Sequence, residues 1–269
     1  MIDDDNYLVE NVSDLKDISI DTYTSYFYNV YHNLNDVEKR LITAASVIGI
    51  KFNINELSYL EPLDKIKIVE ILDKLVKSNI INALDNENFE FQQVEYQEIL
   101  YKKEILNLRR RFLHKKLAEY YEKSCTCPDK IGLNYYLGLE NGKAEFYLRE
   151  AVDLMVLKND YRSALNYMEK IMSISKNKNV DDFILIGDCY FKLGNFKKAI
   201  NYYDMSMEMV NKDDKNLVSK ILIKKADVYS NQGNYKESKN ILEEVSKIAD
   251  PNNISLMFHI NSIIVKSIT

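Results

Sequence analysis

A repeat in the last third of the chain constrains its fold more than any other sequence feature. Gly194 and Gly233 lie 39 residues apart, and each follows a tyrosine by four positions, Tyr190 in the first copy and Tyr229 in the second. Self-similarity at a period of 20 to 50 residues is typical of architectures in which each repeat is one small unit packed on its neighbours. The last third of this chain is therefore predicted to be a stacked array.

Small residues at matching positions of the two copies indicate pairs of packed helices. Gly187 in the first copy corresponds to Ala226 in the second, and Ala199 corresponds to Ser238. Such small side chains let the two helices of a hairpin approach closely, and the glycine before each Asn-aromatic pair ends a helix without a Cβ penalty. The pattern resembles the tetratricopeptide repeat.

Two further segments extend this array. A degenerate earlier copy places Asn159 where the next copy has Gly194, 35 residues later, and an apolar stretch over 254–268 has the character of half a hairpin. We expect about three hairpins over 129–269, followed by the first half of another hairpin that is not completed. A repeat end without a polar cap normally needs a cover, so we expect a docked partner, self-association through this end, or a longer natural chain.

The front of the chain has a different pattern. Asn35 with Glu38, and Asn53 with Glu56, resemble capping boxes that open two helices. Apolar spacing over 68–75 predicts a third helix, and two short apolar runs around a polar 85–88 segment predict a hairpin. Three helices followed by a two-stranded wing is winged-helix order. We therefore predict a helical lead-in over 1–33, a winged-helix domain with following helices over 34–123, and a mainly α chain with a tetratricopeptide-like α-α superhelix behind it.

Charge and composition exclude several classes. Only 7 glycines and 3 prolines occur in 269 residues, too few turn residues for a many-stranded β fold. A net charge of −5 argues against a chain devoted to nucleic-acid phosphate. The acidic first residues and the lack of a long apolar run predict a cytoplasmic protein. Cys125, Cys127 and Cys189 have no zinc spacing, so no metal site is expected.

The order and spacing of these segments resemble the regulatory part of the signal-transduction ATPases with numerous domains, of the large bacterial regulator type. The matching stretches are 34–42, 44–52, 72–76, 89–91, 99–101, 109–114 and 135–164. The resemblance implies a winged helix followed by helical repeats, with the nucleotide-binding ATPase domain missing from this chain. Gln93 stands where the family often has a histidine, so no role of that histidine is transferred.

The resemblance also implies how such a chain would act. The repeats would sense a protein or peptide partner, and the winged helix would pass the change on within bacterial signalling or transcription control. The family's groove positions fall on mixed charges, which favours a polar peptide. These positions are Asp188, Lys192, Lys220, Asp227 and Asn231. A receptor for a peptide pheromone, bound with the help of Asn231, is an alternative.

DNA binding through the winged helix is the sharper alternative. The third predicted helix holds the position of a recognition helix, and its lysines are Lys65, Lys67, Lys74 and Lys77. The positive charge of these lysines is partly offset by the acidic residues Asp64, Glu70 and Asp73. The helix also has no arginine for bidentate guanine recognition. A basic run, 109–111 with 114–116, is either a solvated helix face or a contact for an acidic partner or an anionic ligand.

Catalytic motifs are absent from the sequence. The 138–144 segment has leucine before it and ends in Ala144, so it lacks Walker A spacing. His32, His114 and His259 form no metal or triad pattern. We therefore predict a protein that is not an enzyme and has no cofactor.

Overall fold

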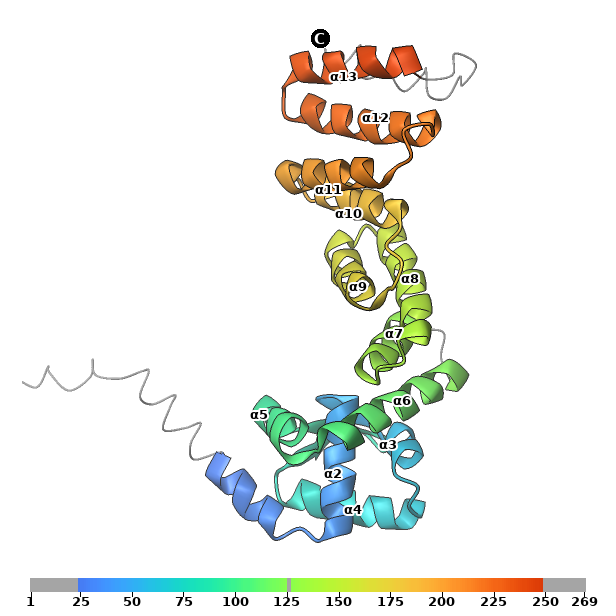
Figure 1. The fold of residues 1–269 in the computed structure, drawn as a ribbon. Coiled ribbons are helices and arrows are strands. Elements are labelled where there is room, and N and C mark those ends of the chain that lie inside the picture. The colour runs from blue at the N-terminus through green and yellow to red at the C-terminus, as the bar shows by residue number, and fades with distance from the viewer. Residues whose placement is uncertain (1–23, 125–126, 249–269) are drawn as a thin grey trace, which may run out of the picture. The chain divides into compact units, whose positions relative to one another are not determined.

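The computed structural model describes residues 24–124 and 127–248 of the chain. The predicted lead-in up to residue 23, Cys125, the 254–268 stretch and His259 lie outside the described residues. Helices dominate the described part, which confirms the prediction of a mainly α chain (Figure 1). Within these residues, no helix is both long and apolar enough to span a bilayer. The chain divides into two compact units, 1–140 and 141–269.

The first unit combines helices with a small sheet (Figure 1, blue to green). Residues 24–32 are helical. The following elements are α2 (Asp36–Ile48), β1 (Lys51–Asn53), α3 (Ile54–Leu60), α4 (Lys65–Lys77), β2 (Ile81–Ala83), β3 (Asn88–Phe91), α5 (Val94–Ile99), the π-helix η1 (Leu100–Glu104), α6 (Asn107–Ser124) and α7 (Pro128–Leu137). The winged-helix interpretation of this order stays a prediction.

Both predicted capping boxes are present and begin α2 and α3. The Asn35 side chain accepts the backbone N–H groups of Val37 and Glu38, and the Glu38 carboxylate accepts the N–H of Asn35. Asn53 and Glu56 form the same reciprocal pair. Each box satisfies N–H groups that the first turn of a helix leaves without partners.

The sheet contains one strand more than the sequence predicted. The predicted hairpin is β2 with β3, and β1 adds to the other edge of β3, so the antiparallel order is β1-β3-β2. Phe52 of β1 lies opposite Phe89, and their rings stack at 5.8 Å. A three-residue strand is too short to show the alternating pattern that identifies strands in a sequence.

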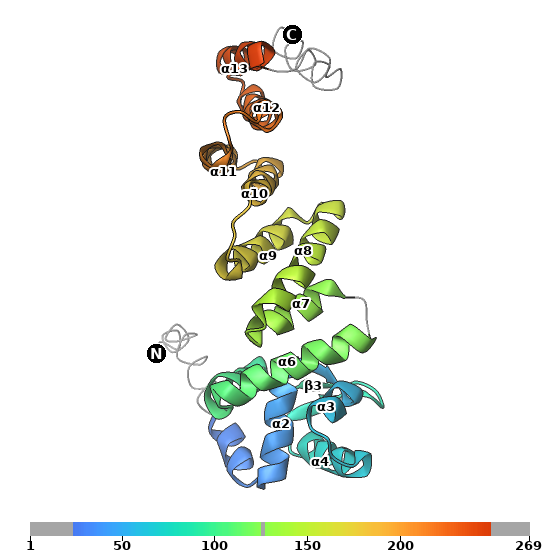
Figure 2. The same ribbon diagram turned by 45° about the vertical axis from the view of Figure 1, so that its right-hand side comes forward.

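Over residues 141–248, the second unit is a series of three antiparallel helical hairpins (Figure 2, yellow-green to red). They are α8 (Asn141–Leu157) with α9 (Tyr161–Ile174), α10 (Val180–Lys192) with α11 (Phe196–Met209), and α12 (Lys215–Asn231) with α13 (Tyr235–Ile248). Gly194 and Gly233 hold φ values of 74° and 77° in their turns, as predicted from the repeat. The repeat region was expected to begin at 129, whereas α7 packs on α6 in the first unit.

The small residues permit the predicted close approach. The Tyr203 ring of α11 lies against Gly187 of α10, so closely that a Cβ on Gly187 would come within 2.5 Å of it. In the next hairpin, Ser238 donates its hydroxyl hydrogen to the Ala226 carbonyl at 2.9 Å. In both of these hairpins the two helices approach each other at a small residue, where a large side chain would hold them apart.

Candidate interaction groove

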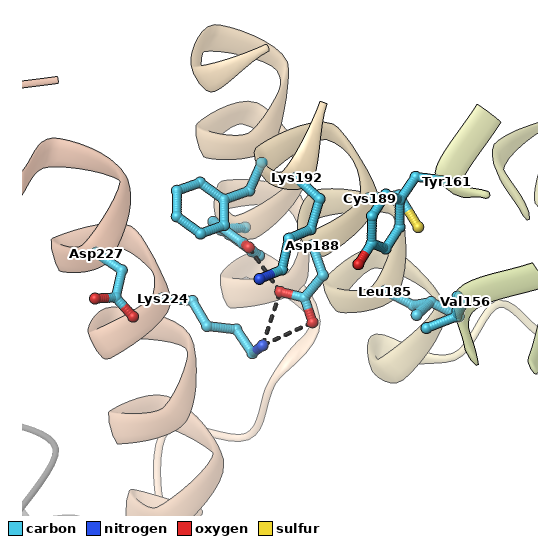
Figure 3. Close-up of a pocket in the computed structure, with 10 residues that line it drawn as sticks. Val156, Tyr161, Leu185, Asp188, Cys189, Lys192, Lys224 and Asp227 are labelled. Atoms are coloured by element: carbon cyan, nitrogen blue, oxygen red, sulfur yellow. Dashed lines mark hydrogen bonds and ion pairs between the residues drawn. The ribbon is translucent and has the colours of Figure 1, made fainter. Parts of the chain in front are cut away.

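A cavity of about 290 Å³ opens in the second unit where residues from all three hairpins converge (Figure 3). We call it the groove pocket. Its lining residues are Val156, Tyr161, Leu185, Asp188, Cys189, Phe191, Lys192, Tyr203, Lys224 and Asp227. Its volume lies near the lower end of the range for small-ligand sites, about 300 to 1,000 Å³, which suits one large side chain better than a whole cofactor.

Asp188 is the polar centre of the groove pocket (Figure 3). Its carboxylate accepts the Tyr203 hydroxyl at 2.7 Å, and each of its oxygens lies 2.7 Å from the Lys224 ammonium. Asp188 is on α10 and Lys224 is on α12, so this ion pair joins two successive hairpins. The half-buried setting strengthens such a pair relative to one in open water.

Burial and the Asp188 charge keep the neighbouring groups protonated. Burial, and then the Asp188 carboxylate, raise the pKa of Tyr203 above its ordinary value. The same two causes raise the pKa of the Cys189 thiol to about 11. A thiolate is the nucleophilic form of cysteine, so Cys189 is held in its unreactive form at neutral pH.

The opposite side of the groove pocket is apolar. Val156 at the end of α8, Tyr161 at the start of α9 and Leu185 of α10 face it from neighbouring elements (Figure 3). Leu185 also borders a second hollow of about 240 Å³, which contains Asp153 and Asp181. The two hollows therefore meet along one face of α10.

A bidentate ion pair stiffens that second hollow. Arg149 of α8 donates to both oxygens of the buried Asp182, at 2.6 and 3.1 Å, and also contacts Glu145 at 2.8 Å. The bonds to Asp182, followed by those to Glu145, raise the pKa of the Arg149 guanidinium. Fork-shaped pairs of this kind fix geometry as well as charge, so α8 and α10 are held in one arrangement.

Three of the five predicted groove residues line the pocket together. Asp188, Lys192 and Asp227 lie there, whereas Lys220 is exposed outside it. Asn231 lies outside as well and donates its side-chain N–H to the Asp227 carbonyl at 2.8 Å. The structure brings the first three together because they belong to the facing first helices of two hairpins.

Sequence reasoning missed Lys224, Tyr203 and Tyr161. Lys224 was detectable, because it lies four residues after Lys220 and three before Asp227, which places it on the same helix face. Tyr161 and Tyr203 belong to the second helices of their hairpins. They were missed because the predicted groove positions all lie on first helices.

The lysines proposed for DNA contact do not form one free basic face on α4. Lys74 lies 2.8 Å from the Glu38 carboxylate. Burial, the largest single effect, acts to raise the pKa of Glu38, but the hydrogen bonds from Lys74 and from the Asn35 N–H together lower it. Lys65, Lys67 and Lys77 are exposed. The hollow beside Lys67 is bordered by acidic residues, namely Asp36, Glu38 and Glu70.

The basic run on α6 is divided among structural contacts. Arg109 binds Glu61, Lys115 pairs with Glu140, and Lys116 donates to the Leu60 carbonyl at 2.8 Å. His114 is buried between the Tyr101 hydroxyl and the Asn134 side-chain oxygen, each 2.8 Å away. Within 24–124 and 127–248, no three His, Cys, Asp or Glu residues gather as a metal site would require.

A known protein family matches two of the three hairpins that line the groove pocket. Residues 183–250 match the tetratricopeptide repeat family. The tetratricopeptide repeats predicted from the 39-residue period are thereby confirmed over α10 to α13. No curated protein matches the chain.

One solved structure similar to this chain is the crystal structure of a signal transduction ATPase with numerous domains that has a tetratricopeptide repeat sensor, from Pyrococcus horikoshii. The two are 16% identical with a TM-score of 0.48, over 90% of this chain and 36% of that one. This chain spans about a third of the length of that protein.

Proposed function

We propose that this chain is a non-catalytic interaction module whose tetratricopeptide repeats bind an extended segment of a partner protein or peptide. Tetratricopeptide repeats generally bind proteins or peptides, and the matched residues 183–250 include most of the groove pocket. The observation that carries the proposal is the pocket itself, where one apolar wall and one charged wall from three hairpins face the same space.

The face of α10 shows how a segment would lie. Asp181, Leu185, Asp188 and Lys192 are spaced by four, three and four residues, so they form one row along the helix. The row passes from the second hollow into the groove pocket, through the shared Leu185. One apolar side chain of the segment would enter the pocket, and polar groups on either side would meet Asp181 and Lys192.

The role of the first unit forms the second half of the proposal. Its order of helix, strand, two helices and two strands supports a winged helix that serves as a regulatory spacer. In this scheme the repeats sense the partner and the spacer transmits the change, within an ATPase-type switch of bacterial signalling or transcription control in the cytoplasm.

Three observations count against the DNA-binding alternative. Lys74 is occupied by Glu38, and acidic residues surround Lys67. The exposed side of α4 also carries Ile66 and Val69, which offer nothing to a phosphate. The peptide-pheromone alternative is a special case of the groove proposal, with Asn231 already bonded to its own helix.

The test is quantitative co-purification from native cytoplasm with the full chain as bait. Lys192→Glu reverses a charge in the groove pocket, and the matched control Lys197→Glu reverses an exposed charge on the second helix of the same hairpin. We expect a defined set of proteins to be lost with Lys192→Glu and retained with Lys197→Glu. Identical protein sets for both variants, or retention of DNA alone, would contradict the proposal.

A further inference from the structure

We propose that the first unit carries a separate docking site for an acidic segment of a partner that inserts one large apolar side chain. The site is a hollow of about 450 Å³ formed by α2, the end of α3 and the first half of α6, which we call the α6 hollow. Its cations are Arg40, Arg109 and Lys116, and its apolar residues include Leu60, Phe112 and Leu113.

The shape of the α6 hollow suits an inserted side chain. Leu60 and Leu113 are buried at its base, whereas Phe112 at its edge is 58% exposed. Leu108, one turn earlier on α6, is 81% exposed. Exposed aromatic and aliphatic side chains beside a buried apolar surface mark interaction sites. An anchor residue of a partner contributes most to the binding free energy when it is desolvated in such a pocket.

The positive charge of the α6 hollow favours acidic residues on either side of the apolar side chain that the partner inserts. Three cations face one carboxylate, Glu61, so the lining groups carry a net charge of +2. Both oxygens of Glu61 are already taken, Oε2 by Arg40 at 2.9 Å and Oε1 by Arg109 at 2.6 Å. The chain as a whole has a net charge of −5, which makes this a local reversal of sign.

Two of the cations retain capacity for a ligand. The Arg40 side chain is 64% exposed, and Glu61 takes only one of its terminal nitrogens. Lys116 donates to the Leu60 carbonyl and has no carboxylate partner among the described residues. An arginine fork and an ammonium beside an apolar base match a carboxylate next to a large apolar side chain.

A free phosphate or a nucleic acid fits the α6 hollow less well. The Arg109 guanidinium already donates hydrogen bonds to Thr43, the Arg40 carbonyl and Glu61. The rest of the lining of the α6 hollow is largely apolar. A nucleic acid would need a basic groove along its backbone, extending beyond one pocket, as well as aromatic side chains on which its bases stack. The observations therefore favour an acidic and apolar polypeptide segment.

The test measures fluorescence anisotropy of short labelled peptides with the full chain. The first peptide has one phenylalanine flanked by aspartates, the second replaces phenylalanine by serine, and the third replaces the aspartates by asparagines. We expect the first to bind, and the second and third to bind at least about tenfold more weakly, a difference of about 1.4 kcal/mol. Raising the salt concentration should weaken the first peptide most.

Substitutions with matched controls locate the binding. Arg40→Gln and Phe112→Ala should each weaken the first peptide about tenfold. Arg111→Gln, in the same basic run, and Phe146→Ala, at a phenylalanine that is also 58% exposed but lies in the second unit, should leave its affinity unchanged. Circular dichroism checks that each variant is folded.

Several outcomes would overturn the proposal. They are equal affinity for all three peptides, no binding of the first peptide, an equal effect of the test and control substitutions, and full displacement by millimolar inorganic phosphate, which would indicate a simple anion site. Lys192→Glu should have no effect in this assay, so failure here is distinguishable from failure of the groove proposal.

Discussion

The contact between Gly187 and Tyr203 shows how one residue sets the spacing of a hairpin. Tyr203 is buried and its hydroxyl reaches Asp188, so the ring is held at both ends of its side chain. Gly187 supplies the space that the ring occupies. Core positions packed to native density tolerate an added methyl group poorly.

Gly187→Ala is therefore expected to lower the free energy of unfolding by about 1 to 3 kcal/mol, because the new Cβ would collide with the Tyr203 ring. Gly142→Ala is the matched control, since nothing lies within 4 Å of a Cβ there. Alanine in a helix should make that variant equal to the wild type or more stable. Urea denaturation of both variants checks this, and equal stability of the two would contradict the packing argument.

His114 is a buried histidine with both ring nitrogens hydrogen-bonded. Burial, the largest effect, lowers its pKa below the ordinary value of 6.5, and the bond to Asn134 opposes that change. The unfolded chain therefore takes up a proton at this residue at higher pH than the folded chain does. The stability that His114 contributes is present above about pH 6.5 and is lost as the pH falls below it.

The measurement is the free energy of unfolding between pH 7.5 and pH 5, taken from urea denaturation at several pH values. His114→Gln should be less stable than the wild type at pH 7.5, yet lose less stability on acidification. His32→Gln, at an exposed residue, should retain the wild-type dependence on pH. A wild-type slope in His114→Gln would show that the acid sensitivity arises elsewhere.

At the scale of elements, α6 is fastened to α2 and α3 by one charged cluster. Arg109 of α6 donates to the Thr43 hydroxyl at 2.9 Å, to the Arg40 carbonyl at 2.8 Å and to Glu61 at 2.6 Å. The Glu61 side chain is only 6% exposed. From the sequence, the basic run 109–111 with 114–116 is expected to face solvent or a partner. In the structure, much of it instead holds α6 to its neighbouring elements.

Glu61→Gln should accordingly cost about 2 kcal/mol of unfolding free energy, less than for a fully buried pair because Arg40 is largely in water. The matched control is Glu98→Gln, which disrupts the exposed pair with Lys102 on one helical stretch and should change stability by less than about 0.5 kcal/mol. Thermal and urea denaturation measure both. Similar losses in the two variants would contradict the anchoring role of Glu61.

At the scale of the whole molecule, the chain consists of two compact units. In the second unit, each hairpin contacts its neighbours in sequence, α9 with α10 and α11 with α12. The stability of such an array is close to a sum over hairpins and the interfaces between neighbours. The second unit should therefore hold its structure without residues 1–140.

A fragment of residues 141–269 is expected to retain a helical circular dichroism spectrum and a cooperative unfolding transition. A shorter fragment of residues 211–269 keeps the last described hairpin but removes its neighbours, and it should be largely unfolded because single hairpins bury too little apolar surface. A fragment 141–269 without a cooperative transition would contradict the independence of the second unit.

Local patterns made much of the fold predictable. The capping boxes at Asn35 and Asn53 and the turn glycines Gly194 and Gly233 depend on residues a few positions apart, so the sequence shows them directly. The strand β1 and the π-helix η1 were not predicted, since a three-residue strand and a one-turn change of helix type leave no periodic signal. The groove face was predicted in part, through Asp188, Lys192 and Asp227.

By itself, the sequence determined the helical hairpins, their period and their turns, because helix formation, capping and turn geometry are governed by neighbouring residues. Only the tertiary structure decided which charges meet. Glu61 and Arg109 are 48 residues apart, and Asp188 and Lys224 are 36 apart. Many carboxylates in this chain could pair with either cation, and only the packing of the helices selects one, since an ion pair requires contact distance and a half-buried setting.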